Sequence, residues 1–225
     1  MSKSFVMLMI LVSFIVITFS FSAESHTMKM ILIPTETNIA TETFSIKDIG
    51  SKSFEVTSQT VIDINYQGTV YKAEYLTAGN FDDFKVESYS ATITATNGNF
   101  YYFLNKVENG FEIYYQTPVA SNKKVFNTSE DLYLLDNNIM WNWFLIIKVL
   151  EKSKENNLKV VIPQLSSHPM IDIPVFDLKV LDEYSEDNYK FYILSLVNSQ
   201  IIVKIDETGK ITEILQGAFK VTQSN

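Results

Sequence analysis

The stretch from Leu134 to Lys152 limits what this chain can fold into, because nearly everything around it is patterned for β-strands. Its apolar residues recur at helical spacing, and they are Ile139, Met140, Trp141, Trp143, Phe144, Leu145, Ile146, Ile147 and Leu150. Asp136, Asn137 and Asn138 precede them and are good N-cap residues. We therefore predict a helix over 138–152. A helix apolar on nearly all sides must be covered on most of them, and about a dozen apolar residues fall short of the ~20 that span a bilayer, so a core helix is expected.

The rest of the chain is predicted to form strands. Residues 53–66 alternate with period two, which is typical of a half-buried strand. Asn97-Gly98 and Asn109-Gly110 indicate two hairpins with type I′ turns. We expect irregular structure over 118–131 and an acidic loop over 182–188. The predicted fold is mainly β: a single strongly curved antiparallel sheet or half-barrel that clasps one central helix. No composition break divides residues 24–225, so they are predicted to form one domain.

The first 23 residues have the pattern of a signal peptide. Lys3 supplies a positive start, residues 5–21 are apolar or small, and Ser20 to Ala23 offer small residues at a cleavage site. We predict cleavage after Ser22 or Ala23 and export to the periplasm or the extracellular space, with no transmembrane span after signal removal. An uncleaved anchor is the alternative. The chain has no cysteine, so it is not expected to be a lipoprotein.

Composition excludes several classes of function. Without cysteine there are no disulfides, thiol nucleophiles or thiolate metal sites. All 18 basic residues are lysine, and 26 acidic residues bring the net charge to −8. The absence of arginine removes bidentate clamps for phosphate or carboxylate groups. An acidic chain of this kind is a poor nucleic-acid binder, because binding to the phosphate backbone needs a basic surface. Neither nucleic acid nor a cofactor is therefore expected.

Three short motifs resemble those of a family of exported bacterial domains of unknown function. They are Leu135-Asp136-Asn137-Asn138 before the helix, Val161-Ile162-Pro163-Gln164 after it, and the turn from Asp206 to Lys210. The resemblance implies a curved antiparallel sheet around one helix, of the lipoprotein-carrier clamp type. It implies no established activity, and no site residue is carried over.

No residue pattern indicates catalysis or metal binding. His26 follows the export segment and is expected in a loose terminus. Ser166, Ser167 and His168 lie too close in sequence to form a triad, which is assembled across a fold. The acidic residues of 182–187 lack the spacing of a calcium loop, and Asp82-Asp83 and Asp206 fit turns. An enzyme would need Asp, Glu, Lys or Tyr alone, so a non-enzyme is predicted.

Aromatic residues give the sharper hypothesis about function. Tyr and Phe crowd the strands on either side of Asn109-Gly110, and alternation places some on each face. They can be core and cross-strand pairs, or they can line an apolar groove between sheet and helix for an acyl chain or lipopeptide. For the groove, the predicted ligand contacts are Trp141, Trp143, Tyr102 and Tyr114. The alternative is a structural or assembly protein of the cell envelope that binds a partner protein through a strand edge.

Overall fold

The structure is a computed structural model that describes residues 23–66, 68–153 and 155–224. Its described residues form fifteen strands and one α-helix. The strands of the first half are β1 (Ala23–Leu32), β2 (Thr37–Asp48), β3 (Ser53–Tyr66), β4 (Thr69–Asp82), β5 (Lys85–Ala95), β6 (Gly98–Val107), β7 (Gly110–Gln116), β8 (Ser121–Asn127) and β9 (Tyr133–Leu134). After helix α1 (Trp141–Ser153) come β10 (Asn157–Val161), β11 (Val175–Glu186), β12 (Tyr189–Leu196), β13 (Ser199–Asp206), β14 (Ile211–Gln216) and β15 (Phe219–Ser224). Two 3-10 turns, η1 (Ile33–Thr35) and η2 (Pro163–Ser167), complete the described elements.

All fifteen strands belong to one sheet, in the order β8-β7-β6-β5-β4-β3-β2-β1-β15-β14-β13-β12-β11-β10-β9. Strands that follow one another in the chain pair antiparallel, with two exceptions: β8 and β9 lie at opposite edges of the sheet, and β9 pairs with β10 in parallel. The first and last strands lie side by side, with Met30 opposite Val221. The sheet is therefore two meanders joined at the chain ends, and the predicted mainly β, curved-sheet fold is confirmed.

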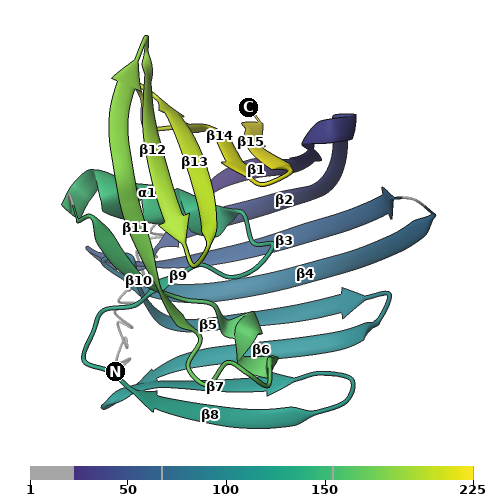
Figure 1. The fold of residues 1–225 in the computed structure, drawn as a ribbon. Coiled ribbons are helices and arrows are strands. Elements are labelled where there is room, and N and C mark those ends of the chain that lie inside the picture. Colours follow the sequence, from purple (N-terminus) through teal and green to yellow (C-terminus); the bar gives the residue numbers. More distant parts are fainter. Residues whose placement is uncertain (1–22, 67, 154, 225) are drawn as a thin grey trace, which may run out of the picture.

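The sheet curves around α1, which lies between the N-terminal strands and the C-terminal strands (Figure 1). The inner faces of the strands and the helix share one apolar core, in which Trp141, Phe44, Phe81, Tyr89 and Tyr192 are almost completely buried. Alternation accounts for this arrangement, since every second residue of a strand points into the curve. Inside the curve, the chain before the helix crosses back to β5, where the Val86 amide donates to the Leu132 carbonyl at 3.0 Å.

The helix begins later than predicted. The expected bounds were 138–152, and α1 spans Trp141–Ser153. Asn138 adopts a left-handed conformation with a φ of 60°, which cannot continue into a right-handed helix. The segment from Asp136 to Asn138 therefore turns the chain into the core, and it does not supply the N-cap.

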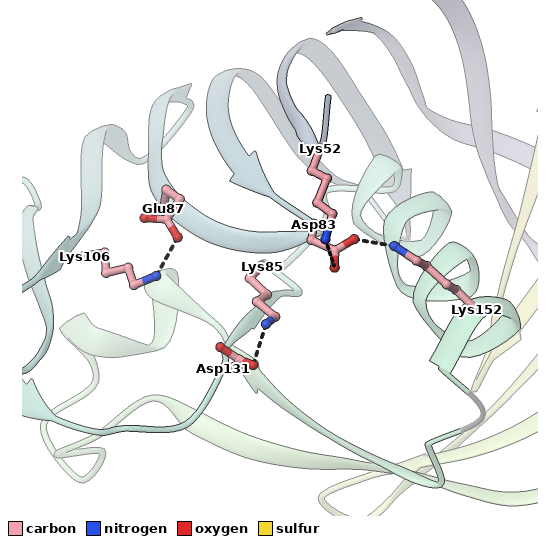
Figure 2. A network of polar contacts seen from close by, with 7 residues as sticks. All are labelled: Lys52, Asp83, Lys85, Glu87, Lys106, Asp131 and Lys152. Atoms are coloured by element: carbon pink, nitrogen blue, oxygen red, sulfur yellow. Dashed lines mark hydrogen bonds and ion pairs between the residues drawn. The ribbon is translucent and has the colours of Figure 1, made fainter. Parts of the chain in front are cut away.

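The far end of the helix is held at the protein surface by ion pairs. Lys152 binds Asp83 in the β4–β5 turn, and Lys52 lies 3.9 Å from the same carboxylate (Figure 2). Lys85, on β5, pairs with Asp131 at 2.7 Å. Exposed pairs of this kind each stabilise a fold by about 0–1 kcal/mol, so they contribute little to the stability of the fold.

Two predicted loops are strands. Residues 118–131 contain β8, and the acidic stretch 182–188 is largely β11, which pairs with β12 as far as Glu186–Tyr189. This end of β11 is exposed on both faces and so tolerates charge, while the Tyr184 ring stacks on Phe191 with centroids 4.8 Å apart. The hydrophobic pattern disappears where neither face is buried, and backbone pairing alone then defines the strand.

Both predicted hairpins form, but without type I′ turns. Thr96-Asn97 and Glu108-Asn109 are the turn residues, and the glycines are the first residues of β6 and β7. Gly98 and Gly110 have φ values of 124° and 150°, whereas neither asparagine has a positive φ. A Cβ at Gly110 would overlap the Phe126 carbonyl, and one at Gly98 would overlap Pro118. These glycines are needed for close approach of the next segment.

Candidate functional site

The start of α1 is capped by a carboxylate from a distant strand. Glu42 lies on the inner face of β2, between the buried Ala40 and Phe44. Its Oε2 accepts the Trp141 backbone N–H at 2.7 Å. Its Oε1 accepts the hydroxyls of Thr60 and Ser58 at 2.7 and 3.2 Å. Helix N-termini have unpaired N–H groups and a partial positive charge, so Glu42 satisfies one of these donors, the N–H of Trp141, and places a carboxylate beside the positive end of the helix.

Burial dominates the electrostatics of Glu42. The side chain is fully buried, and desolvation raises its pKa from 4.5 to about 7. Hydrogen bonds from Thr60, Trp141, Ser58 and Met140 oppose that rise and lower the pKa. The group therefore titrates near neutral pH inside the core.

Trp141 belongs to the same polar cluster through its indole N–H and packs its ring against the apolar core. Its indole Nε1 donates to Thr77 Oγ1 at 3.2 Å, and Thr77 shares a 2.8 Å hydrogen bond with Ser58. The indole ring meets Phe81 edge-on at 5.6 Å. No part of Trp141 is exposed, so this residue binds the helix to the sheet from within.

A second buried carboxylate, Asp136, joins two of the motifs noted in the sequence. Asp136 Oδ1 accepts the backbone N–H groups of Asn137 and Gln164 at 3.0 and 3.1 Å. Oδ2 accepts the Tyr89 hydroxyl at 2.8 Å and Gln164 Nε2 at 3.2 Å. Burial raises the pKa of Asp136 to about 6, against these hydrogen bonds, which lower it. The Leu135–Asn138 and Val161–Gln164 motifs thus pack together and position the loop that leads into the helix.

The neighbouring residues complete this loop. The Asp136 backbone N–H donates to the side-chain oxygen of the buried Asn142, the second residue of the helix. Asn138 Nδ2 donates to the Tyr75 hydroxyl at 3.3 Å. The loop is therefore held by the helix on one side and by β4 on the other.

A cavity of about 370 Å³ lies against this loop. Its walls come from β1–β3, the loop before α1 with Trp143 of the helix, Ile162, and β12–β15. The first and last described strands, β1 and β15, are neighbours in the sheet and both contribute (Figure 1). The apolar lining residues are Met30, Ile39, Ile62, Ile64, Leu135, Ile139, Met140, Trp143, Ile162, Leu196, Ile214, Gly217, Ala218, Phe219 and Val221. The polar ones are Asp136, Asn137, Asn138, Ser199 and Gln216. An apolar cavity of this size with a few polar groups is typical of a small-molecule site.

The four predicted ligand contacts do not lie together. Trp143 lines the cavity and is 7% exposed. Trp141 is enclosed by β4 and β5. Tyr102, on β6, is buried elsewhere and shares a 3.3 Å hydrogen bond with Ser167. Tyr114 lies on β7 with its hydroxyl toward Gln116 and is 36% exposed. Of the four, Trp143 is therefore the one that a ligand in this cavity would touch.

Sequence reasoning missed Glu42, Asp136 and most of the cavity walls. Glu42 falls in the polar, threonine-rich stretch 35–43, which contains no apolar run that would predict a buried strand. Its period-two position between Ala40 and Phe44 is the signal that could have placed it on the inner face. Ser58 and Thr60 likewise interrupt the inward, otherwise apolar face of β3. Polar residues on an inward face indicate a buried polar partner.

The residues weighed for catalysis have structural roles. His26 lies in β1, not in a loose terminus, with its ring packed between Phe44 and Phe144 at 5.0 and 5.2 Å. Ser166 and Ser167 donate to backbone carbonyls of the η2 turn, and His168 Nδ1 accepts the Met170 N–H. In the described part of the chain, no group of three His, Asp or Glu side chains is arranged to hold a metal ion. Within the same residues, no helix has the length and apolar character needed to cross a membrane.

Comparison with known proteins supports the architecture. No family model matches the chain, and no curated protein matches it. A β-barrel-like protein of the domain of unknown function DUF1849 from Brucella abortus has a TM-score of 0.51 at 8% identity, over 90% of this chain and 94% of that chain. A DUF1089 family protein from Pseudomonas aeruginosa has a TM-score of 0.42 at 12% identity, over 76% of this chain and 86% of that chain. The DUF1849 likeness shows a shared fold, and it agrees with the predicted resemblance to an uncharacterised domain.

Proposed function

We propose that this protein is an exported, non-catalytic binding module that holds a small hydrophobic molecule between its sheet and its helix. The observation that carries the proposal is the cavity of about 370 Å³ beside the start of α1. Close-packed interiors contain few voids larger than a water molecule. Here a mainly apolar space of this size persists next to Trp143, where the loop before the helix meets the strands.

The buried polar groups around the cavity support a rigid site. Glu42 and Asp136 each hold several donors from different elements, so the helix start and its preceding loop are cross-linked to β2, β3, β5 and η2. A site that is already shaped before binding loses less conformational entropy when the ligand enters. The cavity is thus suited to holding a ligand with little rearrangement.

Filling the cavity tests the proposal. Ile64→Trp places a large ring in the cavity, and Val61→Trp is the matched control on the opposite, exposed face of the same strand. With decanol as the probe, wild type and Val61→Trp should gain thermal stability, and Ile64→Trp should gain none. A ligand at about 100 times its Kd stabilises a protein by about 2.7 kcal/mol, and each kcal/mol raises the Tm of a chain this size by about 2–4 °C.

The result that would overturn the proposal is equal stabilisation of all three proteins, or of none. Native mass spectrometry of the protein purified from its own cells provides a second measurement. A co-purified apolar molecule in wild type, absent from Ile64→Trp, is the expected result.

The structural alternative, binding through a strand edge, concerns β8, because the other edge strand of the described sheet, β9, is two residues long and buried. Within the described residues β8 pairs with β7 on one side only, and Val125 on it is 59% exposed. However, β8 also carries Lys123 and Lys124, and lysines on an edge strand oppose strand addition. Crosslinking in the source cells that captures a partner at β8 would favour this alternative.

A further inference from the structure

The charge of the cavity walls restricts what the cavity can hold. Among the described residues that line it there is no lysine or histidine, and the chain contains no arginine. Of these described lining residues, Asp136 is the ionisable one, and it is buried. The described walls of the cavity therefore offer no cation to pair with an anionic ligand.

An ionised fatty acid would be unfavourable in this space. Its carboxylate would lose its water shell without gaining an opposite charge, which costs several kcal/mol for a buried ion. It would also lie in the same cavity as the Asp136 carboxylate, and like charges at short range in a low-dielectric interior repel strongly. Both the lost hydration and the repulsion weaken the binding of an anionic ligand.

A cationic amine gains little from Asp136. All four hydrogen bonds to the two carboxylate oxygens come from the protein itself: from Asn137, Tyr89 and twice from Gln164. An ammonium group would have to displace one of these donors and lose its own hydration. The carboxylate is therefore a structural acceptor and is not free to bind a ligand charge.

Uncharged polar groups fit the cavity better. Ser199, Gln216 and Asn137 line it and are partly or fully exposed, so they can exchange hydrogen bonds with a hydroxyl, ester or amide. At roughly 30 Å³ per non-hydrogen atom, the volume of a water molecule in the liquid, the cavity holds about a dozen such atoms.

Building on the proposed function, we infer that the cavity selects an uncharged single-chain amphiphile, of the size of a medium-chain alcohol or ester, over fatty acids and alkyl amines. The apolar walls bind the chain, and the neutral polar residues bind the head group. Selectivity comes from the absence of a counter-ion.

The experiment compares three probes with the same chain on the same full-length protein. Decanol, decanoate and decylamine would be titrated calorimetrically at about pH 8, where the carboxylate and the ammonium are both ionised. Decanol should bind, and each charged probe should bind at least about tenfold more weakly. A charged probe that binds as tightly as decanol would overturn the inference and leave the proposed function standing. If none of the three binds, the proposed function itself fails.

A lysine introduced into the cavity wall tests whether the lack of a cation causes the selectivity against anions. Gln216→Lys adds a cation to the lining, and Gln116→Lys adds the same charge at the exposed last residue of β7, outside the cavity. The ratio of decanoate to decanol affinity should rise about tenfold in Gln216→Lys and stay constant in Gln116→Lys. A ratio that rises equally in both variants, or in neither, contradicts the inference. Ser199→Lys, at a more exposed lining position, serves if Gln216→Lys does not fold.

Discussion

Two buried carboxylates organise this protein at the scale of single residues. Glu42 and Asp136 lie in the core, where an unpaired charge would be strongly destabilising. Each is surrounded by donors from elements distant in sequence, and Glu42 binds an amide 99 positions away. Their role is to fix the orientation of the segment that carries Ile139, Met140 and Trp143 into the cavity.

Replacing Glu42 should show how much its hydrogen bonds contribute to the stability of the fold. Glu42→Ala leaves the Trp141 N–H and the hydroxyls of Ser58 and Thr60 without their acceptor, and buried unsatisfied donors cost about 1–3 kcal/mol each. We expect a loss of about 3 kcal/mol in the free energy of unfolding, measured by denaturant titration. Glu74→Ala, an exposed carboxylate on β4, is the control and should change stability by about 0.5 kcal/mol or less. Equal effects would contradict the capping role.

The pH dependence of stability follows from the raised pKa of Glu42. Because that pKa rises from 4.5 to about 7 on folding, the folded protein holds the proton more tightly. The stability linked to this group is complete below pH 4.5 and is lost as the pH rises through about 7, by up to about 3 kcal/mol. Glu42→Gln keeps the shape and cannot titrate. The stability of wild type relative to Glu42→Gln should therefore fall between pH 4.5 and 7, and a constant difference would contradict the assignment.

At the scale of elements, periodicity and turn signals located most of the structure. The alternation of residues 53–66 corresponds to β3, and the Asn-Gly pairs mark two real hairpins. The predictions were wrong where neighbouring elements determine the local structure. β8 and the end of β11 were predicted as loops because they lack an apolar face. The helix was predicted from residue 138, but α1 starts after the left-handed Asn138. The predicted type I′ turns were also wrong, because Gly98 and Gly110 are needed where the next segment approaches the chain closely, and not at the central position of a turn.

Gly110 provides a test at this scale. A Cβ there would overlap the Phe126 carbonyl and approach the Asn127 Cα, so Gly110→Ala must displace β8 from β7. We expect a loss of about 2–3 kcal/mol, typical of overpacking at a rigid site. Gly50→Ala is the control, since its Cβ would meet ordinary contacts at 3.5 Å or more and its φ is unstrained. Thermal unfolding of both variants would decide, and an unchanged Tm for Gly110→Ala would contradict the close approach.

At the scale of the whole molecule, the pairing of β1 with β15 joins the two meanders and closes the cavity. Met30 and Val221, opposite each other in this pair, both line the cavity. An intact β1 is therefore required for the site. The predicted signal peptide over 1–23 lies almost entirely outside the described residues, and the predicted cleavage after Ser22 or Ala23 falls at the first residues of β1.

Export can be tested on the same protein. If the leader is removed as predicted, the intact mass of the protein from its source cells should correspond to a chain that begins at Ala23 or Glu24. Such a chain keeps β1 and should bind decanol as the full chain does. A mass that includes residue 1 would instead favour the uncleaved anchor.

Strand alternation, the apolar run and the Asn-Gly pairs by themselves determined that this chain forms a β-sheet around one buried helix, because these patterns are local and reflect which side of each element leaves water. Tertiary structure alone decided that Glu42 caps the helix, that Asp136 joins the two motifs, and that Trp143 lines a cavity while Trp141, Tyr102 and Tyr114 do not. Those outcomes depend on residues far apart in the chain meeting across a curved sheet, and the curvature comes from the sum of all strand twists. No short segment carries that information.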